Sequence, residues 1–237
     1  WSLLVLVSCS TGQSTADPIA EDAKNVKLVG HHDLQGRTAL VVTTKSDAAN
    51  GNWVYVGHHE SFRDGKPLLN SITGKMEFNG TSILEISDPA APRLVWHIPN
   101  ESNRNSRSVS VVYDYKFDSS GRDYLIRNSE ELTQGETGQD LKYQIFDITT
   151  RDTNPSGISL VSEITGTPAN SCGPGCGGKF TNRAHKGWWS EETGYFYAAS
   201  GEPGFRNVII QIFDLKNPSP PKLIGRGGPA GINDGEP

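Results

Sequence analysis

The sequence predicts an all-β fold, and three observations support this prediction. Few stretches show the spacing of an amphipathic helix, whereas short runs of β-branched and aromatic residues recur throughout the chain. Gly, Pro, Asn and Asp separate these runs, as is typical of turns between strands. One longer pattern also occurs three times. Because 35% of the 237 residues are hydrophobic, the chain can bury a core.

The recurring pattern is a strand-like run that ends in an acidic residue, followed by a proline-containing turn and a second apolar run. Its copies are "SILEISDPAAPRLVWHI" at 82–98, "QIFDITTRDTNPSGISLVSEI" at 144–164 and "QIFDLKNPSPPKLIGR" at 211–226. Their acidic residues, Glu85, Asp147 and Asp214, are 62 and 67 residues apart. We expect these carboxylates to accept backbone N–H bonds in the turns, which excludes them from any binding site.

Two further strand-like runs precede each copy of the pattern. They are "TALVVTT" and "NWVYVG", then "SVSVVYD" and "DYLIRN", then "KGWWS" and "GYFYAAS". Tandem units of four antiparallel strands, A to D, are typical of β-propeller blades, whereas a β-sandwich would not require the repeated pattern. We therefore predict about three blades within residues 26–237. Since a ring needs at least about four blades, we expect a truncated chain whose missing blades follow residue 237.

The same segments resemble the bacterial LVIVD-repeat β-propeller proteins. The resemblance lies in the "YVG" strand end, in "ILEISDPAAP" and "IFDLKNPSPP", and in the aliphatic run after each proline turn. It covers roughly residues 26–226. It implies a repeat protein built from four-stranded blades, and its motifs are strand and turn patterns and not catalytic ones.

The first residues are similar to the end of a bacterial lipoprotein signal peptide. The run "WSLLVLVSCS" is too short to span a bilayer, and a small residue precedes Cys9, which we expect to be lipidated. Residues 10–25 would then be a polar tether. The lipid would be the only membrane contact of an exported protein in the outer membrane, the periplasm or the cell surface. The alternative is a buried first strand with an incidental cysteine.

The other two cysteines, Cys172 and Cys176, flank Gly-Pro-Gly. That segment can turn tightly enough to close a small disulfide ring, so we predict a disulfide between Cys172 and Cys176. A zinc site would need a second Cys or His pair nearby, and two free surface thiols are the remaining alternative.

Five of the six histidines are predicted to lie at one face. In a blade, the D-to-A and B-to-C connections leave the same face of the propeller. His31 and His32 follow the strand-like "VKLVG" in a D-to-A connection, while His58 and His59 begin a B-to-C connection, and His185 ends another D-to-A connection. His97 lies within strand D and is left out. The same face is predicted to present Arg127, Glu130, Lys186, Glu202 and Arg206 to a ligand.

These histidines allow two interpretations. Adjacent residues of a strand point to opposite sides, so one histidine of each pair, together with His185, can share a site. Three imidazoles with Glu60 or Glu202 can bind copper or zinc, although no HExxH-like spacing specifies the geometry and calcium is not indicated. Alternatively, they are structural histidines that bond to loop backbones. For Trp188 and Trp189, alternation predicts that one packs between blades and that the other can line the channel.

The net charge and the absence of certain motifs exclude some classes of function. A net charge of -5 and a pI near 5.7 do not favour nucleic acid as a partner. Gly-x-Ser-x-Gly, a Walker-type loop and a dinucleotide fingerprint are absent from the sequence. We therefore favour a binding module for a protein, peptide or glycan over an enzyme.

Two enzyme hypotheses remain open. One is a copper- or zinc-dependent propeller enzyme, such as an oxidoreductase, by analogy with the histidine doublets of the selenium-binding-protein and methanethiol-oxidase group. The other is a hydrolase or lyase in which His185 acts as a base near Glu202 or Arg206.

Overall fold

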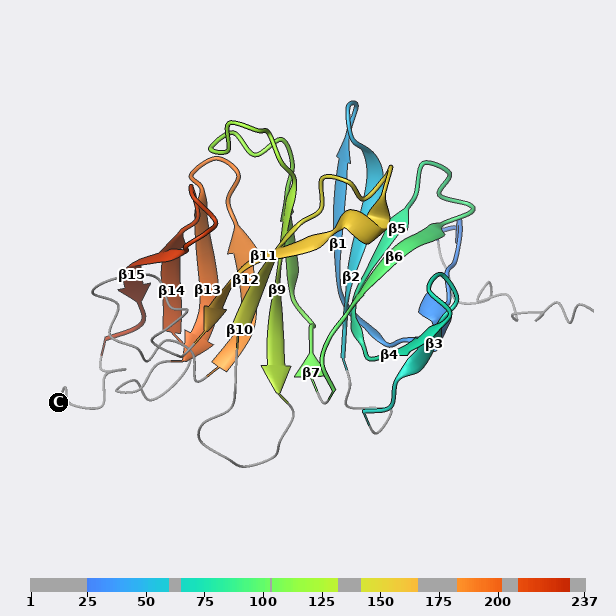
Figure 1. The fold of residues 1–237 in the computed structure, drawn as a ribbon, viewed down its shortest axis with the longest axis horizontal. Helices are drawn as coiled ribbons and strands as arrows, with labels where there is room; N and C mark the ends of the chain where they lie inside the picture. Colours follow the sequence, from blue (N-terminus) through green and yellow to red (C-terminus); the bar gives the residue numbers. More distant parts are fainter. Residues whose placement is uncertain are drawn as a thin grey trace, which may run out of the picture.

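The computed structural model describes residues 25–59, 65–102, 104–131, 142–165, 183–201 and 209–230. Within these ranges the chain forms fifteen β-strands and two 3-10 helices of three residues each, η1 (Leu34–Gly36) and η2 (Pro155–Gly157), and no α-helix. The predicted all-β class is therefore confirmed for the described residues (Figure 1).

Three antiparallel sheets follow one another along the chain. The first sheet has the order β1 (Ala39–Asp47), β2 (Gly51–His58), β5 (Gly80–Glu85) and β6 (Arg93–Pro99). The second contains β8 (Val109–Val112), β9 (Tyr124–Glu131), β10 (Lys142–Asp147) and β11 (Ser159–Thr165), and the short β7 (Arg104–Asn105) also pairs with β9. The third has the order β12 (Arg183–Trp189), β13 (Tyr195–Gly201), β14 (Ile209–Asp214) and β15 (Lys222–Gly227).

Two local features differ from the predictions. The predicted B-to-C connection after β2 contains a hairpin of β3 (Leu68–Asn70) and β4 (Lys75–Glu77), two strands that the sequence analysis did not predict. The segment "VKLVG" at 26–30 was expected to be a strand, but it forms none. No strand of the described residues lies beside it to complete a hydrogen-bonded ladder, which a strand requires.

The three repeated segments fold as the last two strands of their sheets, β5–β6, β10–β11 and β14–β15. Each pair has a register shift at the same place, one residue before the acidic end of the strand. The shift leaves one extra residue on the last strand, which is Val95, Val161 or Ile224. The sheets thus share a β-bulge as well as a strand order.

The three acidic residues also play the same part in each turn. Glu85 accepts the backbone N–H of Ser87 at 2.6 Å, and Asp147 accepts that of Thr149 at 2.9 Å. Asp214 accepts the N–H of Lys216 at 2.9 Å. The expected structural role of these carboxylates is confirmed.

The sheets stack side by side through their first strands. Thr43 of β1 donates its hydroxyl to the carbonyl of Val109 in β8 at 2.8 Å. The hydroxyl of Ser110, also in β8, accepts the backbone N–H of Trp189 in β12 at 3.0 Å. These three strands are therefore neighbours in the order β1, β8, β12.

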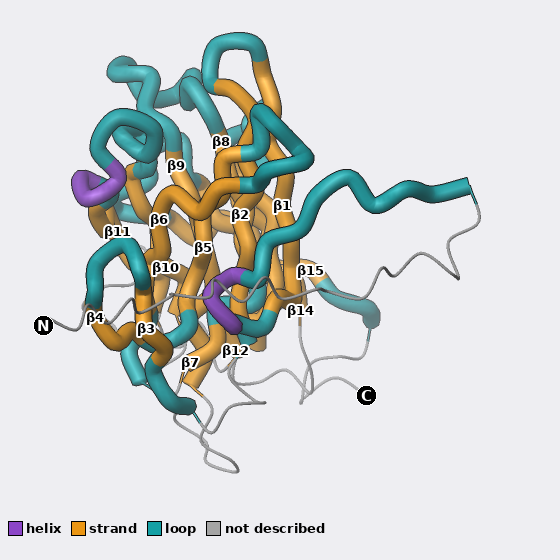
Figure 2. The backbone as a smooth tube through the Cα atoms, turned by 90° about the vertical axis from the view of Figure 1, so that its right-hand side faces the viewer, coloured by secondary structure: helices purple, strands orange, loops and turns teal. Residues whose placement is uncertain are grey.

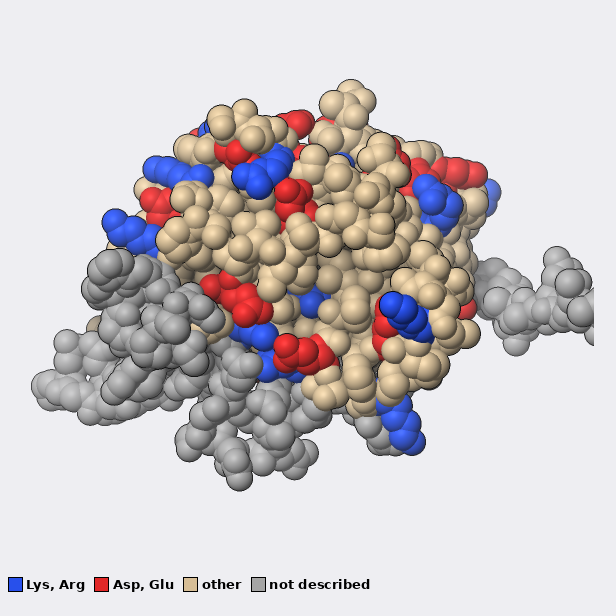
Figure 3. Space-filling model, in the orientation of Figure 1, with Lys and Arg blue, Asp and Glu red and all other residues tan. Residues whose placement is uncertain are grey.

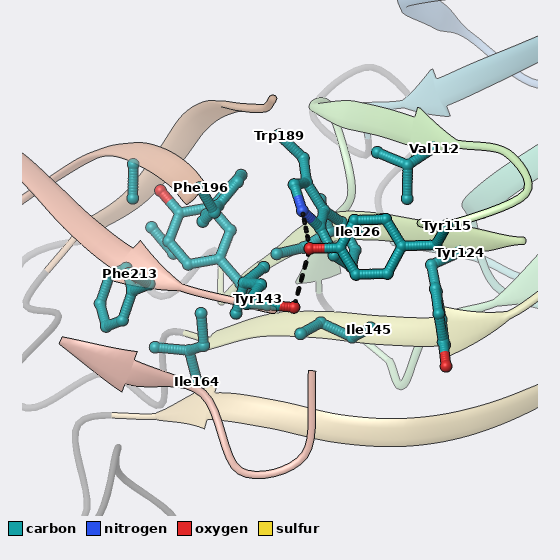
Figure 4. Close-up of a cluster of buried hydrophobic side chains, with 13 residues drawn as sticks. Val112, Tyr115, Tyr124, Ile126, Tyr143, Ile145, Ile164, Trp189, Phe196 and Phe213 are labelled. Atoms are coloured by element: carbon teal, nitrogen blue, oxygen red, sulfur yellow. Dashed lines mark hydrogen bonds between the residues drawn. The ribbon is translucent and has the colours of Figure 1, made fainter. Parts of the chain in front are cut away.

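Each junction between sheets buries an apolar layer. We call the face of a sheet that packs on the next sheet in the chain its forward face, and the opposite face its backward face. At the first junction the forward-face residues Trp53, Tyr55 and Ile83 meet Val109, Val111, Leu125 and Phe146. At the second junction Tyr124, Ile126, Tyr143 and Ile145 meet Trp189, Phe196 and Phe213 (Figure 4).

The two neighbouring tryptophans point to opposite sides of β12, as alternation predicts. Trp189 is 1% exposed in the second junction, where its indole N–H donates to the hydroxyl of Tyr115 at 3.3 Å (Figure 4). Trp188 is 60% exposed on the opposite face of the third sheet, which points away from the second junction. Trp189 is therefore the tryptophan of the pair that packs between sheets.

Candidate functional site

A polar cluster forms where strands of all three sheets end or begin on one side of the molecule. In Figure 1, β9 and β13 end and β12 begins at the lower edge of the sheets. We call the group made by His59, Arg107, Glu130 and His185 the lower-face cluster. His59 follows β2 of the first sheet, and His185 lies in β12 of the third. Arg107 lies between β7 and β8, and Glu130 lies in β9, so both come from the second sheet region.

The centre of the lower-face cluster is an ion pair. The guanidinium of Arg107 donates a hydrogen bond from Nη2 to Oε2 of Glu130. Both side chains are mostly buried, with 19% and 17% of their surfaces exposed. In the part of the chain that the structure describes, Nε of Arg107 is buried without a hydrogen-bond partner. The protein itself leaves this donor unused.

The charges of this ion pair affect the pKa of both histidines in the lower-face cluster. Partial burial lowers the pKa of His59, the positive charge of Arg107 lowers it further, and Glu130 acts in the opposite direction. Burial and then the charge of Arg107 also lower the pKa of His185, Glu130 again acts in the opposite direction, and the charge of Lys186 lowers it further. At neutral pH both imidazoles are therefore neutral, and each can donate one hydrogen bond and accept another.

Two predicted ligand-facing residues lie outside the lower-face cluster. Lys186 is exposed on β12 beside His185. Arg127, in contrast, is only 2% exposed, and its guanidinium donates to the carbonyls of Ile98 at 2.7 Å and Pro99 at 2.9 Å. The structure thus corrects the placement of Arg127, which links the second sheet to the end of the first instead of facing a ligand. Burial lowers its pKa to about 9.

The two histidines of each adjacent pair lie in different surroundings. His31 is exposed, whereas Nδ1 of His32 accepts the backbone N–H of Leu34 at 2.9 Å. His58 is fully buried, with Nδ1 2.7 Å from the carbonyl of Thr38, while His59 joins the lower-face cluster. The alternative of structural histidines that bond to backbone therefore describes His32 and His58.

The residues described by the structure contain no group of three or more His, Cys, Asp or Glu side chains that could hold a metal ion. Several predicted residues lie outside the described ranges, namely Glu60, Glu202, Arg206, Cys9, Cys172 and Cys176. The predicted lipidation and disulfide, and the carboxylate ligands of the predicted metal site, therefore stay predictions.

A buried network that the sequence did not reveal connects His58 to His97. Nε2 of His58 lies 2.8 Å from the hydroxyl of Ser82, which lies 3.2 Å from Nδ1 of His97. The other nitrogen of His97 lies 2.9 Å from the carbonyl of Phe78. Burial lowers the pKa of His58 to about 4 and holds that of His97 well below its usual range. Both imidazoles are neutral interior groups.

Charges of both signs are interleaved on the side of the molecule shown in Figure 3. One charge network joins Lys142 to Glu101 at 3.5 Å and to Glu163 at 3.3 Å, and Glu101 also pairs with Arg104 at 2.9 Å. Among the described residues, the side shown in Figure 3 therefore carries no extended surface of a single sign that would bind a polyanion.

The fold and the lower-face cluster define a broad class of protein, in which consecutive antiparallel sheets of four or five strands carry a polar site at one edge. Comparison of the chain with family models and with curated proteins found no match. Among the described residues, no helix is long and apolar enough to cross a membrane.

Proposed function

We propose that the three sheets are consecutive blades of a β-propeller related to the LVIVD-repeat proteins. Three properties support this proposal: the common strand order, the β-bulge at the same position, and the contacts between successive first strands. In a propeller the first strands line the central channel, so β1, β8 and β12 would surround it.

The protein acts, in our proposal, as a binding module whose ligand sits at the lower face. The observation that carries this proposal is the lower-face cluster, because three sheets contribute side chains to one polar site. Neutral imidazoles and a guanidinium beside a carboxylate offer several donors and acceptors within a partly desolvated surface. Such a site suits a polar ligand, which we propose to be a protein or peptide segment or a glycan.

We further propose that the module is held at a bacterial membrane by lipid on Cys9 and that residues 10–25 are its tether. The support is the apolar run before Cys9 and the polar composition after it. Metabolic labelling with a palmitate analogue tests this proposal, since a Cys9→Ala variant should lose the label.

Binding to the lower face is tested with labelled protein on peptide and glycan arrays, followed by calorimetry with the strongest ligand. Arg107→Ala and His185→Ala should each weaken binding at least tenfold, about 1.4 kcal/mol. His31→Ala is the matched control, because this exposed histidine lies outside the lower-face cluster. Unchanged affinity in both cluster variants, with circular dichroism showing an intact fold, would place the ligand elsewhere.

A further inference from the structure

The hairpin of β3 and β4 is polar on its inner side, which contacts Arg37. This arginine is 5% exposed, and its guanidinium donates to the carbonyls of Leu68 at 3.3 Å and Glu77 at 3.1 Å. The carboxylate of Glu77 accepts hydrogen bonds from the side chains of Asn70 at 2.8 Å and Thr73 at 2.7 Å. Polar contacts around a buried cation therefore hold the hairpin in place.

The outer side of the same hairpin is apolar. Leu69, Ile72 and Met76 are 57%, 42% and 61% exposed. Leu69 and Met76 lie opposite each other in the register of the two strands, and Ile72 lies in the turn that joins them. The hairpin thus reverses the usual arrangement, in which a strand pair turns its apolar side inward and its polar side to water. Exposed apolar side chains that gather in one place mark an interaction surface.

The outer side of the hairpin is also cationic. Within residues 66–77, all of which the structure describes, Lys66 and Lys75 are exposed. The single acidic residue of this range is Glu77, whose carboxylate is held by the side chains of Asn70 and Thr73. Apolar side chains flanked by lysines are typical of segments that lie at the surface of a bilayer, where cations meet anionic headgroups. The composition of the hairpin therefore fits an anionic lipid surface.

The hairpin lies apart from the faces through which the sheets pack on one another. It belongs to the connection between β2 and β5, and none of the buried residues of the two apolar layers comes from β3 or β4. A further sheet that packed in the same way as these three would cover the face of a sheet and not the outer side of the hairpin. That side therefore requires a partner of another kind.

The hairpin also lies near the start of the described chain, where the proposed tether joins the fold. Gln35 of η1 donates from Nε2 to the hydroxyl of Ser71 at 2.7 Å, and the described residues begin at Asn25. Figure 2 shows η1 and the hairpin on the same side of the molecule. Because residues 10–25 can span at most about 55 Å, lipid on Cys9 would keep the hairpin within reach of the bilayer.

We propose that the outer side of the β3–β4 hairpin docks on the anionic surface of the membrane that holds the lipid anchor. Leu69, Ile72 and Met76 enter the boundary of the acyl chains, and the two lysines lie among the headgroup phosphates. The sequence predicted lipid as the only membrane contact, and the hairpin adds a second one. The proposal rests on the lipid anchor proposed above for the nearness of the membrane.

Flotation with vesicles of phosphatidylethanolamine and phosphatidylglycerol tests this surface. The full chain carries Cys9→Ala, so that lipid on the protein contributes nothing. In this background Leu69→Glu and Met76→Glu should each lower the vesicle affinity at least fivefold, because a carboxylate replaces an apolar group beside anionic headgroups. Leu160→Glu is the matched control, since Leu160 is 48% exposed but lies on β11 of the second sheet. Vesicles of neutral phosphatidylcholine should bind the chain more weakly.

Hydrogen exchange locates the contact independently of any binding by the apolar run at residues 1–8. On the anionic vesicles the amides of residues 71–76 should exchange more slowly than in the free protein, and those of β11 should not change. Leu69→Glu and Met76→Glu should restore the faster exchange. The proposal is overturned by unchanged exchange in the hairpin, by glutamate variants that bind and exchange like the parent protein, or by equal binding to neutral vesicles.

Failure of this surface and failure of the lipid anchor are distinguishable. Palmitate label on Cys9 without slower exchange in the hairpin overturns the surface alone, whereas slower exchange without label overturns the anchor alone. The hairpin shares no residue with the lower-face cluster, so ligand affinity tests the proposed binding function separately.

Discussion

The buried network around His58 predicts a loss of stability in acid. The carbonyls of Thr38 and Phe78 require a proton on the nitrogen that faces each of them, so the nitrogens facing Ser82 carry none when both rings are neutral. The hydroxyl of Ser82 has one proton for these two acceptors, and the shorter contact, to His58 at 2.8 Å, is the better hydrogen bond. Further protonation would charge a ring that is sealed from water.

The direction and size of the effect follow from the pKa of His58. The value is 6.5 for an ordinary histidine and about 4 for His58, with burial as the main cause. Between these values the unfolded chain binds a proton that the native state does not, so stability falls as the pH falls from 6.5 towards 4. At about 1.4 kcal/mol per pH unit, His58 alone removes about 3 kcal/mol over this range. The lowered pKa of His97 acts in the same direction.

Urea unfolding at a series of pH values between 7 and 4 measures this effect. Wild-type protein should lose stability steeply below pH 6.5, and His58→Gln should have a shallower pH dependence, by about 3 kcal/mol across the range. His31→Gln is the control, because it removes an exposed histidine. The carboxylates also titrate near pH 4, but they are the same in wild type and variants, so their contribution to the pH dependence of stability cancels in the comparison. Equal slopes for wild type and His58→Gln would refute the reasoning.

Three further predictions concern the second sheet and its contacts. Replacing Arg107 by Gln should raise the pKa of both histidines in the lower-face cluster, because a positive charge is lost and Glu130 is released. NMR titration measures both pKa values. The control Arg122→Gln, at the opposite edge of the sheet, should leave them unchanged. Arg127→Leu should destabilise the fold by about 2–4 kcal/mol in urea unfolding, since it leaves two carbonyls of the first sheet without their donor. Gly57→Ala should lower the free energy of unfolding by about 1–3 kcal/mol in thermal unfolding, because the new Cβ would lie 2.5 Å from a backbone oxygen. Gly225→Ala is the control and should be tolerated, since its Cβ would meet only ordinary contacts that begin at 3.5 Å.

Local patterns were sufficient to predict the strand order and the turns. The alternation of apolar residues and the repeated acidic position depend on neighbours in sequence, and the structure confirms both through Glu85, Asp147 and Asp214. Arg127 was misplaced because β9 continues to Glu131, beyond the expected strand end near residue 128. Its acceptors lie at the end of another sheet, and only the stacking of sheets determines that contact.

The position of His97 shows how a bulge changes what alternation predicts. Leu94 lies opposite Leu84, and strict alternation would place His97, three residues later, on the other face of β6. The extra residue Val95 shifts the pairing by one, so that His97 lies opposite Ser82 and shares a face with His58. A single inserted residue therefore assembles the buried network, and the same bulge in the other two sheets would turn the corresponding residues in the same way. The sheets can therefore be aligned on their acidic residues once the bulge residue is left out of each last strand. This alignment predicts which side chains face each junction.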